Sequence, residues 1–112
     1  MDIAEWRKKI DELDRKMVEL LNERAQAAQE IGRLKRSTAM PIYEPDREKK
    51  IFENVKAVNK GPLSGLDVTQ VFERIIDIMR NLQKNEIVPP QKDDAEKAAA
   101  GAGTEFDVDV NE

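Results

Sequence analysis

The sequence of 112 residues contains neither cysteine nor histidine. Without cysteine there is no disulfide bond and no thiol nucleophile, and without histidine there is no histidine-dependent catalytic triad and none of the usual zinc sites. We therefore expect no metal site. Any reaction must use carboxylates, amides, hydroxyl groups, lysine and arginine.

Long hydrophobic runs are also missing. No apolar stretch approaches the ~18 residues of a membrane span. The N-terminal segment M-D-I-A-E-W-R is acidic and amphipathic, unlike a signal peptide, which has a basic segment followed by a hydrophobic one. We expect a soluble, cytoplasmic protein without membrane contacts.

The net charge of −4 is distributed unevenly along the chain. Residues 88–112 carry seven acids and two lysines, a net charge of −5, so residues 1–87 hold 17 bases and 16 acids, a net charge of +1. A nucleic-acid partner would require a strongly basic face, so we expect none. A small anionic ligand is compatible with this balance.

The C-terminal segment, residues 88–112, begins V-P-P-Q-K-D-D and continues with alanine, glycine and acids. It has too little apolar surface to offset the entropy lost on ordering. We predict a helical domain over residues 1–87 followed by a disordered acidic tail. A docking peptide is the alternative interpretation of the tail.

Residues 1–87 are predicted to form three helices and no strand, which places the chain in the all-α class. From Ile3 to Lys35 there is no proline, and apolar residues recur at spacings of three and four, which predicts one long helix. A second helix is predicted to begin near Pro45, because proline suits the first helical position. It ends at N-K-G-P, where glycine and proline stop a helix. A third follows S-G-L-D at Ser64 and ends before Pro89.

The length of the first helix predicts an assembly. At 1.5 Å per residue it runs ~50 Å, whereas a compact chain of this size has a radius of gyration near ~13 Å. Its two shorter neighbours cannot cover it. We expect an intertwined homodimer with antiparallel long helices, and an extended coiled coil is the competing arrangement.

Four long polar side chains stand on apolar stripes that are expected to face inward: Arg24, Lys35, Arg47 and Gln83. Each alone is compatible with a polar group at the edge of a core whose aliphatic stem is buried. Together they favour an internal pocket for an anion, because buried cations without partners are costly and a ligand carboxylate supplies the missing charge.

Helix geometry limits what such a pocket holds. Arg24 and Lys35 are ~16 Å apart along the axis, so their side chains approach a small ligand from opposite ends. Arg7 lies ~25 Å from Arg24 and does not reach the same ligand within one chain. An antiparallel partner would deliver Arg7 across the dimer axis.

Four segments, taken in order, resemble the all-helical AroQ class (type II) of chorismate mutases. They are W-R-K-K-I-D-E-L-D-R-K-M-V-E-L-L-N-E-R, E-I-G-R-L-K, P-I-Y-E-P-D-R-E and V-F-E-R-I-I-D-I-M-R-N-L-Q. The resemblance covers residues 3–85 and leaves the tail outside. It implies an intertwined helical homodimer with two equivalent active sites built from both chains.

The activity that the resemblance implies is the isomerase reaction from chorismate to prephenate in aromatic amino acid biosynthesis, a pericyclic rearrangement without a cofactor. Arg7, from the partner chain, would hold one substrate carboxylate and Arg24 the other. Lys35 and Gln83 would donate hydrogen bonds to the ether oxygen, which gains negative charge as its bond to carbon breaks.

The resemblance adds further substrate-binding positions. Arg47 matches the arginine of the second-helix motif, and Glu48 matches the neighbouring acid that binds the ring hydroxyl. Glu44 stands where an aspartate is often found, and either caps the helix or belongs to the site. Met79 stands where a serine can occur, which removes a hydroxyl from the site.

Three other interpretations stay open. The first is an isochorismate-pyruvate lyase of the same fold. The second is a non-catalytic helical module that binds an aromatic-pathway enzyme, such as the synthase that opens the pathway. The third is a helical dimer without a site.

Overall fold

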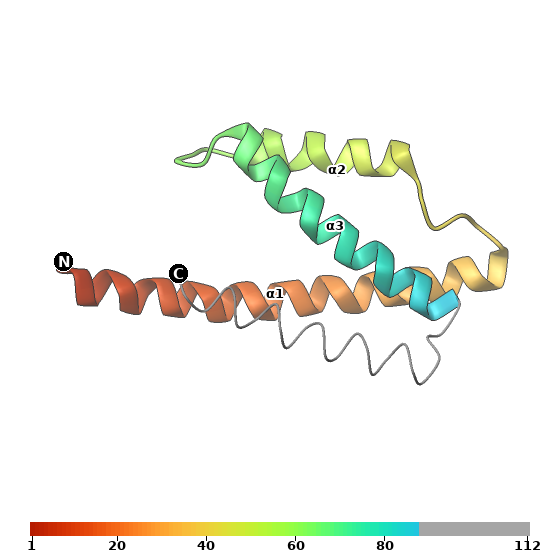
Figure 1. Cartoon of the computed structure of the whole chain (residues 1–112), viewed down its shortest axis with the longest axis horizontal. Helices are drawn as coiled ribbons and strands as arrows, with labels where there is room; N and C mark the ends of the chain where they lie inside the picture. Colours follow the sequence, from red (N-terminus) through yellow and green to blue (C-terminus); the bar gives the residue numbers. More distant parts are fainter. Residues whose placement is uncertain (88–112) are drawn as a thin grey trace.

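The computed structural model describes residues 1–87, and within that range it contains three helices and no strand (Figure 1). They are α1 (Ile3–Thr38), α2 (Pro45–Val58) and α3 (Gly65–Ile87). The predicted all-α class and helix order are confirmed. The predicted tail, residues 88–112, lies outside the described residues.

Hydrogen bonds at both ends fix the extent of α1. Asp2 Oδ1 accepts a hydrogen bond from the backbone N–H of Glu5 at 2.8 Å and so caps the first turn. At the other end Ala39 adopts a left-handed conformation with φ of 57°, and the N–H of Met40 donates to the Lys35 carbonyl at 3.1 Å. The helix therefore ends slightly beyond the predicted boundary at Lys35.

The two shorter helices begin as their sequences predict. Pro45 occupies the start of α2, where its fixed φ and missing N–H cost nothing. Ser64 precedes α3, and its Oγ accepts a hydrogen bond from the N–H of Asp67 at 3.0 Å. In the connecting turn, the Asn59 side-chain amide donates to the Leu63 carbonyl at 2.8 Å.

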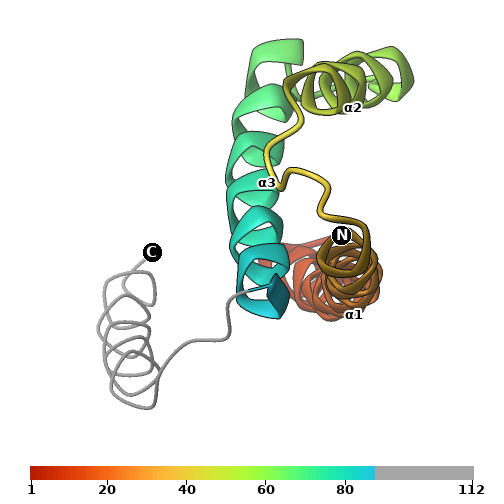
Figure 2. The ribbon, with the colours of Figure 1, turned by 90° about the vertical axis from the view of Figure 1, so that its right-hand side faces the viewer.

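α3 packs against both α1 and α2, whereas α1 and α2 lie apart (Figures 1 and 2). Among residues 1–87 the buried apolar side chains are Ala28 on α1 and Ile76 and Met79 on α3. Gly32 permits a close approach of α3, because a Cβ atom at this position would lie 2.9 Å from the Cα of Gln83. The core is small, and α3 is the element that joins the other two helices.

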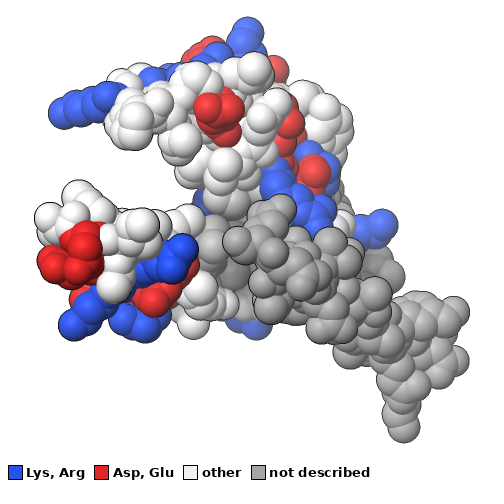
Figure 3. Space-filling view, turned by 60° about the vertical axis from the view of Figure 1, so that its left-hand side comes forward, with Lys and Arg blue, Asp and Glu red and all other residues white. Residues whose placement is uncertain are grey.

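The N-terminal half of α1 extends beyond this core (Figure 1). Its apolar residues are exposed in the single chain, and the radius of gyration of 16.9 Å exceeds the ~13 Å of a compact chain of 100 residues. Figure 3 shows mostly uncharged surface on both sides of a hollow between this arm and the α2–α3 hairpin. We call the exposed apolar residues the α1 stripe: Ile3, Trp6, Ile10, Leu13, Met17 and Leu20.

No helix within residues 1–87 combines the length and the apolar character that a membrane crossing requires.

Candidate functional site

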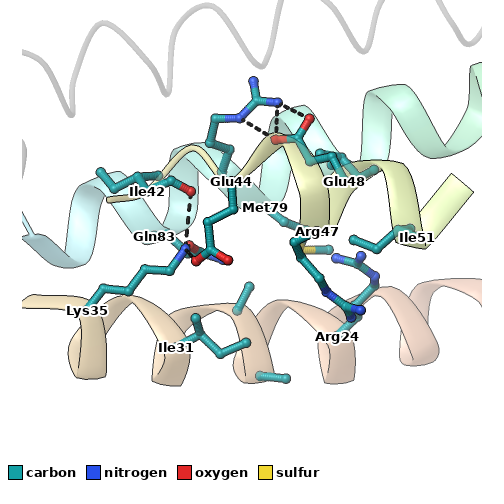
Figure 4. Close-up of a pocket in the computed structure, with 14 residues that line it drawn as sticks. Arg24, Ile31, Lys35, Ile42, Glu44, Arg47, Glu48, Ile51, Met79 and Gln83 are labelled. Atoms are coloured by element: carbon teal, nitrogen blue, oxygen red, sulfur yellow. Dashed lines mark hydrogen bonds and ion pairs between the residues drawn. The ribbon is translucent and has the colours of Figure 1, made fainter. Parts of the chain in front are cut away.

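A pocket of about 340 Å³ lies among the three helices (Figure 4). This volume falls in the range of small-molecule sites. Apolar side chains from all three helices form part of its wall, including Ile31, Ile51 and Ile76. Its charged residues are four cations and two acids, a net charge of +2: Arg24, Lys35, Arg47, Arg80, Glu44 and Glu48.

Lys35 is the one charged side chain that is buried in residues 1–87, with 6% of its surface exposed. Its Nζ lies 2.9 Å from Gln83 Oε1, 3.2 Å from the Ile42 carbonyl and 2.8 Å from a Glu44 carboxylate oxygen. Three acceptors match the three N–H donors of an ammonium group. The buried charge is thereby paired and held in one position.

Gln83 faces Lys35 from α3. Because its Oε1 accepts the hydrogen bond from Lys35, the amide NH₂ group is left as the donor end of the side chain. Gly32 sets this arrangement, since its missing side chain lets the backbone of Gln83 approach α1. The two residues thus place an ammonium group beside a side-chain amide at one end of the pocket (Figure 4).

Arg24 and Arg47 meet at the other end of the pocket (Figure 4). Neither guanidinium forms a salt bridge with an acid of residues 1–87. The pKa of Arg24 is lowered, first by burial and second by Coulombic repulsion from Arg47. Two like charges held together without an acid between them favour the binding of an anion there.

Glu48, in the first turn of α2, is held by Arg80 of α3. Nη2 of Arg80 lies 2.8 Å from Oε1 and 2.7 Å from Oε2 of Glu48, and its Nε lies 3.3 Å from Oε2. Arg80 is a pocket residue that was not predicted from the sequence. Its spacing of three from Asp77 is typical of an ion pair on a solvent-facing side of a helix, and nothing in the sequence connects it to Glu48.

The structure brings seven of the eight predicted site residues to one pocket. Met79 is buried and lines the wall, and Arg47 lines the pocket although it is exposed in the single chain. Glu44 makes no capping hydrogen bond, and its carboxylate pairs with Lys35 instead, so it belongs to the pocket. The other four are Arg24, Lys35, Glu48 and Gln83.

Arg7 is the predicted site residue that does not line this pocket. It lies on the exposed N-terminal arm of α1, seventeen positions before Arg24, which corresponds to ~25 Å of helix. Within one chain it is therefore remote from the four cations. Among residues 1–87 no cluster of carboxylates is arranged to hold a metal ion.

Comparison with known proteins identifies the family. The chain matches the family described as chorismate mutase type II over residues 6–84. A chorismate mutase from Methanocaldococcus jannaschii is 34% identical over 83 residues, which cover 73% of this chain and 84% of that protein. The chain therefore belongs to the chorismate mutase type II family, and the resemblance noted from its motifs is confirmed.

Two further relatives are a much longer bifunctional protein and a solved structure with a bound ligand. A bifunctional chorismate mutase/prephenate dehydratase from Aquifex aeolicus is 36% identical over 87 residues, which cover 74% of this chain and 24% of that relative. This chain thus spans about a quarter of the length of that relative. The crystal structure of chorismate mutase from Helicobacter pylori in complex with prephenate has a TM-score of 0.71 and 28% identity, and the match covers 80% of this chain and 97% of that one.

Proposed function

We propose that this chain is a chorismate mutase, an isomerase that converts chorismate to prephenate in phenylalanine and tyrosine biosynthesis. The observation that carries the proposal is the pocket with paired, acid-free guanidinium groups at one end and the fixed donors of Lys35 and Gln83 at the other. Its net charge of +2 complements a substrate with two carboxylates. The family and the prephenate-bound relative support the same reaction.

Arg24 binds a substrate carboxylate, and Arg47 adds positive charge at the same end of the pocket. Lys35 and the NH₂ group of Gln83 donate to the ether oxygen, whose negative charge grows as its bond to carbon breaks. Glu48 accepts a hydrogen bond from the ring hydroxyl. Met79 and the isoleucines supply apolar contact with the ring.

The rearrangement is unimolecular, so no nucleophile, proton relay or cofactor is needed. The protein selects the compact reactive conformer of the substrate and meets the developing oxyanion with groups already in place. In the free enzyme Glu44 balances the charge of Lys35 at 2.8 Å, which keeps that ammonium group ordered. When substrate binds, its ether oxygen takes the place of one of the three acceptors of Lys35, because an ammonium group has only three N–H donors.

The site is proposed to be completed by a second copy of the chain, with Arg7 of the partner chain binding the second carboxylate. The α1 stripe supports this assembly, because six apolar residues along one helix are exposed in the single chain. The hollow beside the arm is a place for the partner's helix (Figure 3). An antiparallel homodimer covers both stripes and brings each Arg7 toward the opposite pocket.

An aromatic-pathway partner is proposed on the strength of relatives that join chorismate mutase to prephenate dehydratase in one chain. Three expectations from the sequence stay predictions: that the partner is a synthase, that the chain divides into residues 1–87 and 88–112, and that the protein is cytoplasmic.

The proposed function is tested by incubating the purified chain separately with chorismate and with isochorismate, with no cofactor added. We expect prephenate to accumulate from chorismate, and no pyruvate to be released from isochorismate beyond the rate in buffer. Pyruvate release from isochorismate without prephenate formation would identify a lyase. No turnover of either compound would favour a binding module.

A further inference from the structure

Arg80 is a pocket residue to which neither the sequence motifs nor the proposed mechanism gives a role. It lies on α3 beside Met79, and 34% of its side chain is exposed. Its guanidinium is held from three directions. Both carboxylate oxygens of Glu48 accept from Nη2, Asp77 Oδ1 accepts from Nη1 at 3.2 Å, and the ring of Tyr43 lies 5.3 Å from Cζ.

We propose that Arg80 is a positioning residue that fixes the carboxylate of Glu48 as the acceptor for the substrate's ring hydroxyl. The inference rests on the proposed function, since it assigns a role within that site. Arg80 acts through Glu48 in this account and does not itself contact the substrate.

The geometry of the pair supports this role. A carboxylate has about four acceptor positions, and the guanidinium occupies only part of them. The remaining positions of Glu48, which lines the pocket, are left for a ligand hydroxyl. Arginine suits the task better than lysine, because its planar group engages both oxygens at once and so fixes the orientation of the carboxylate.

Charge gives a second reason for the pair. Arg24 and Arg47 line the same pocket and have no acid of their own among residues 1–87. A Glu48 side chain released from Arg80 would be attracted to these guanidinium groups and would compete with the substrate carboxylate for them. Arg80 therefore keeps Glu48 at the hydroxyl position and the other two arginines free for the anion.

Asp77 and Tyr43 keep Arg80 in place. The hydrogen bond to Asp77 spans three residues of α3, and Tyr43 comes from the segment between α1 and α2. The pKa of Arg80 is raised, chiefly by its hydrogen bond to Glu48, so it remains a cation at any pH at which the enzyme is assayed. The carboxylate of Glu48 thus has a permanent and oriented counter-ion.

The test is a double-mutant cycle with Arg80→Gln and Glu48→Gln, measured as kcat and KM for chorismate. Glutamine at position 48 retains an acceptor oxygen but is not drawn toward the arginines, so activity stays measurable. We expect Arg80→Gln to lower kcat/KM about tenfold to a hundredfold in the parent protein, as small misplacements of a site group do. In the Glu48→Gln background the same substitution should change kcat/KM less than about twofold.

Two further variants separate positioning from general stability. Arg33→Gln removes another ion pair between α1 and α3, in which Arg33 Nε lies 3.2 Å from Glu86 Oε2. The two side chains are 48% and 21% exposed and lie outside the pocket. Its kcat/KM should equal that of the parent even where its thermal unfolding temperature falls as far as that of Arg80→Gln. Arg80→Lys should recover part of kcat/KM, because it restores charge without bidentate geometry.

The outcomes distinguish this inference from the proposed function. An equal loss from Arg80→Gln in both backgrounds would mean direct contact with substrate and would overturn the positioning role alone. An equal loss in Arg33→Gln would also overturn it, since the effect would then be structural. A parent protein without chorismate turnover would overturn both claims.

Discussion

The ammonium group of Lys35 donates to Oε1 of Gln83 at 2.9 Å, which joins α1 to α3 through two side chains 48 positions apart in the sequence. This hydrogen bond fixes which end of the Gln83 amide points to Lys35. The NH₂ end is left as a donor, and the ammonium group is held beside it. The two groups proposed to meet the developing oxyanion are therefore oriented by each other before substrate binds.

Replacing Gln83 by glutamate should confine activity to acidic pH. A glutamate donates a hydrogen bond only when protonated, whereas the amide donates at any ordinary pH. The neighbouring Lys35 cation favours the ionised form, which moves the active range further toward acid. The check is a pH profile of kcat/KM for Gln83→Glu beside the parent protein. Unchanged activity at neutral pH would show that Gln83 is not a donor to the ether oxygen.

Lys35→Ala should lower kcat by a factor of about 10² to 10³, the usual loss when one oxyanion donor is removed. The matched control is Lys84→Ala on α3, because Lys84 is exposed and does not line the pocket. Circular dichroism and sedimentation should show that both variants keep the fold and the assembly of the parent. A Lys35→Ala protein with near-normal turnover would contradict the proposed site.

Gly32→Ala should destabilise the protein and reduce kcat together. The added Cβ would lie 2.9 Å from Cα and 3.1 Å from the carbonyl oxygen of Gln83, so α3 must move away from α1. Overpacking of this kind costs about 1 to 3 kcal/mol of the free energy of unfolding, against a gain of ~1 kcal/mol in helix propensity, so we expect a net loss of up to ~2 kcal/mol. Urea denaturation and kinetics measure the two effects.

Gly65→Ala is the control for that experiment. At Gly65 the nearest atom to an added Cβ is Lys56 Cδ at 3.8 Å, an ordinary contact. This variant should retain the stability and activity of the parent. If Gly32→Ala were as stable and as active as Gly65→Ala, the close approach of α3 would not determine the geometry of the site.

Mixing two inactive variants tests the contribution of Arg7 from the partner chain. Arg7→Ala and Lys35→Ala each damage both sites of a homodimer. After denaturation and joint refolding, half of the dimers are mixed and each holds one intact site, so about a quarter of the parent activity should return. Refolding each variant alone is the control. Absence of recovery would mean that Arg7 acts within its own chain, and full activity of Arg7→Ala refolded alone would mean that Arg7 has no role.

The helices were predictable because their signals are local. The spacing of apolar residues along α1, the proline at the start of α2 and the Ser64 cap of α3 each act within a few residues. The exposure of the α1 stripe was predictable from helix length, because a straight helix of that length extends beyond the two shorter helices that pack against it.

The pocket was predictable only in part. Arg24, Lys35 and Gln83 stood out because they interrupt apolar stripes, which is a local signal. Arg80 gave none, because its partner Glu48 lies 32 positions away and their contact depends on how α3 crosses α2. Whether Glu44 caps α2 or belongs to the site was likewise not predictable, because the answer depends on its contact with Lys35, a residue of another element.

The most direct test of the central claim is proton NMR of chorismate mixed with the purified protein, with no cofactor added. We predict one-to-one conversion of chorismate to prephenate, much faster than in buffer, and a rate lower by a factor of about 10² to 10³ in Lys35→Ala. Conversion at the rate of buffer alone, or at the same rate with Lys35→Ala as with the parent protein, would contradict the account.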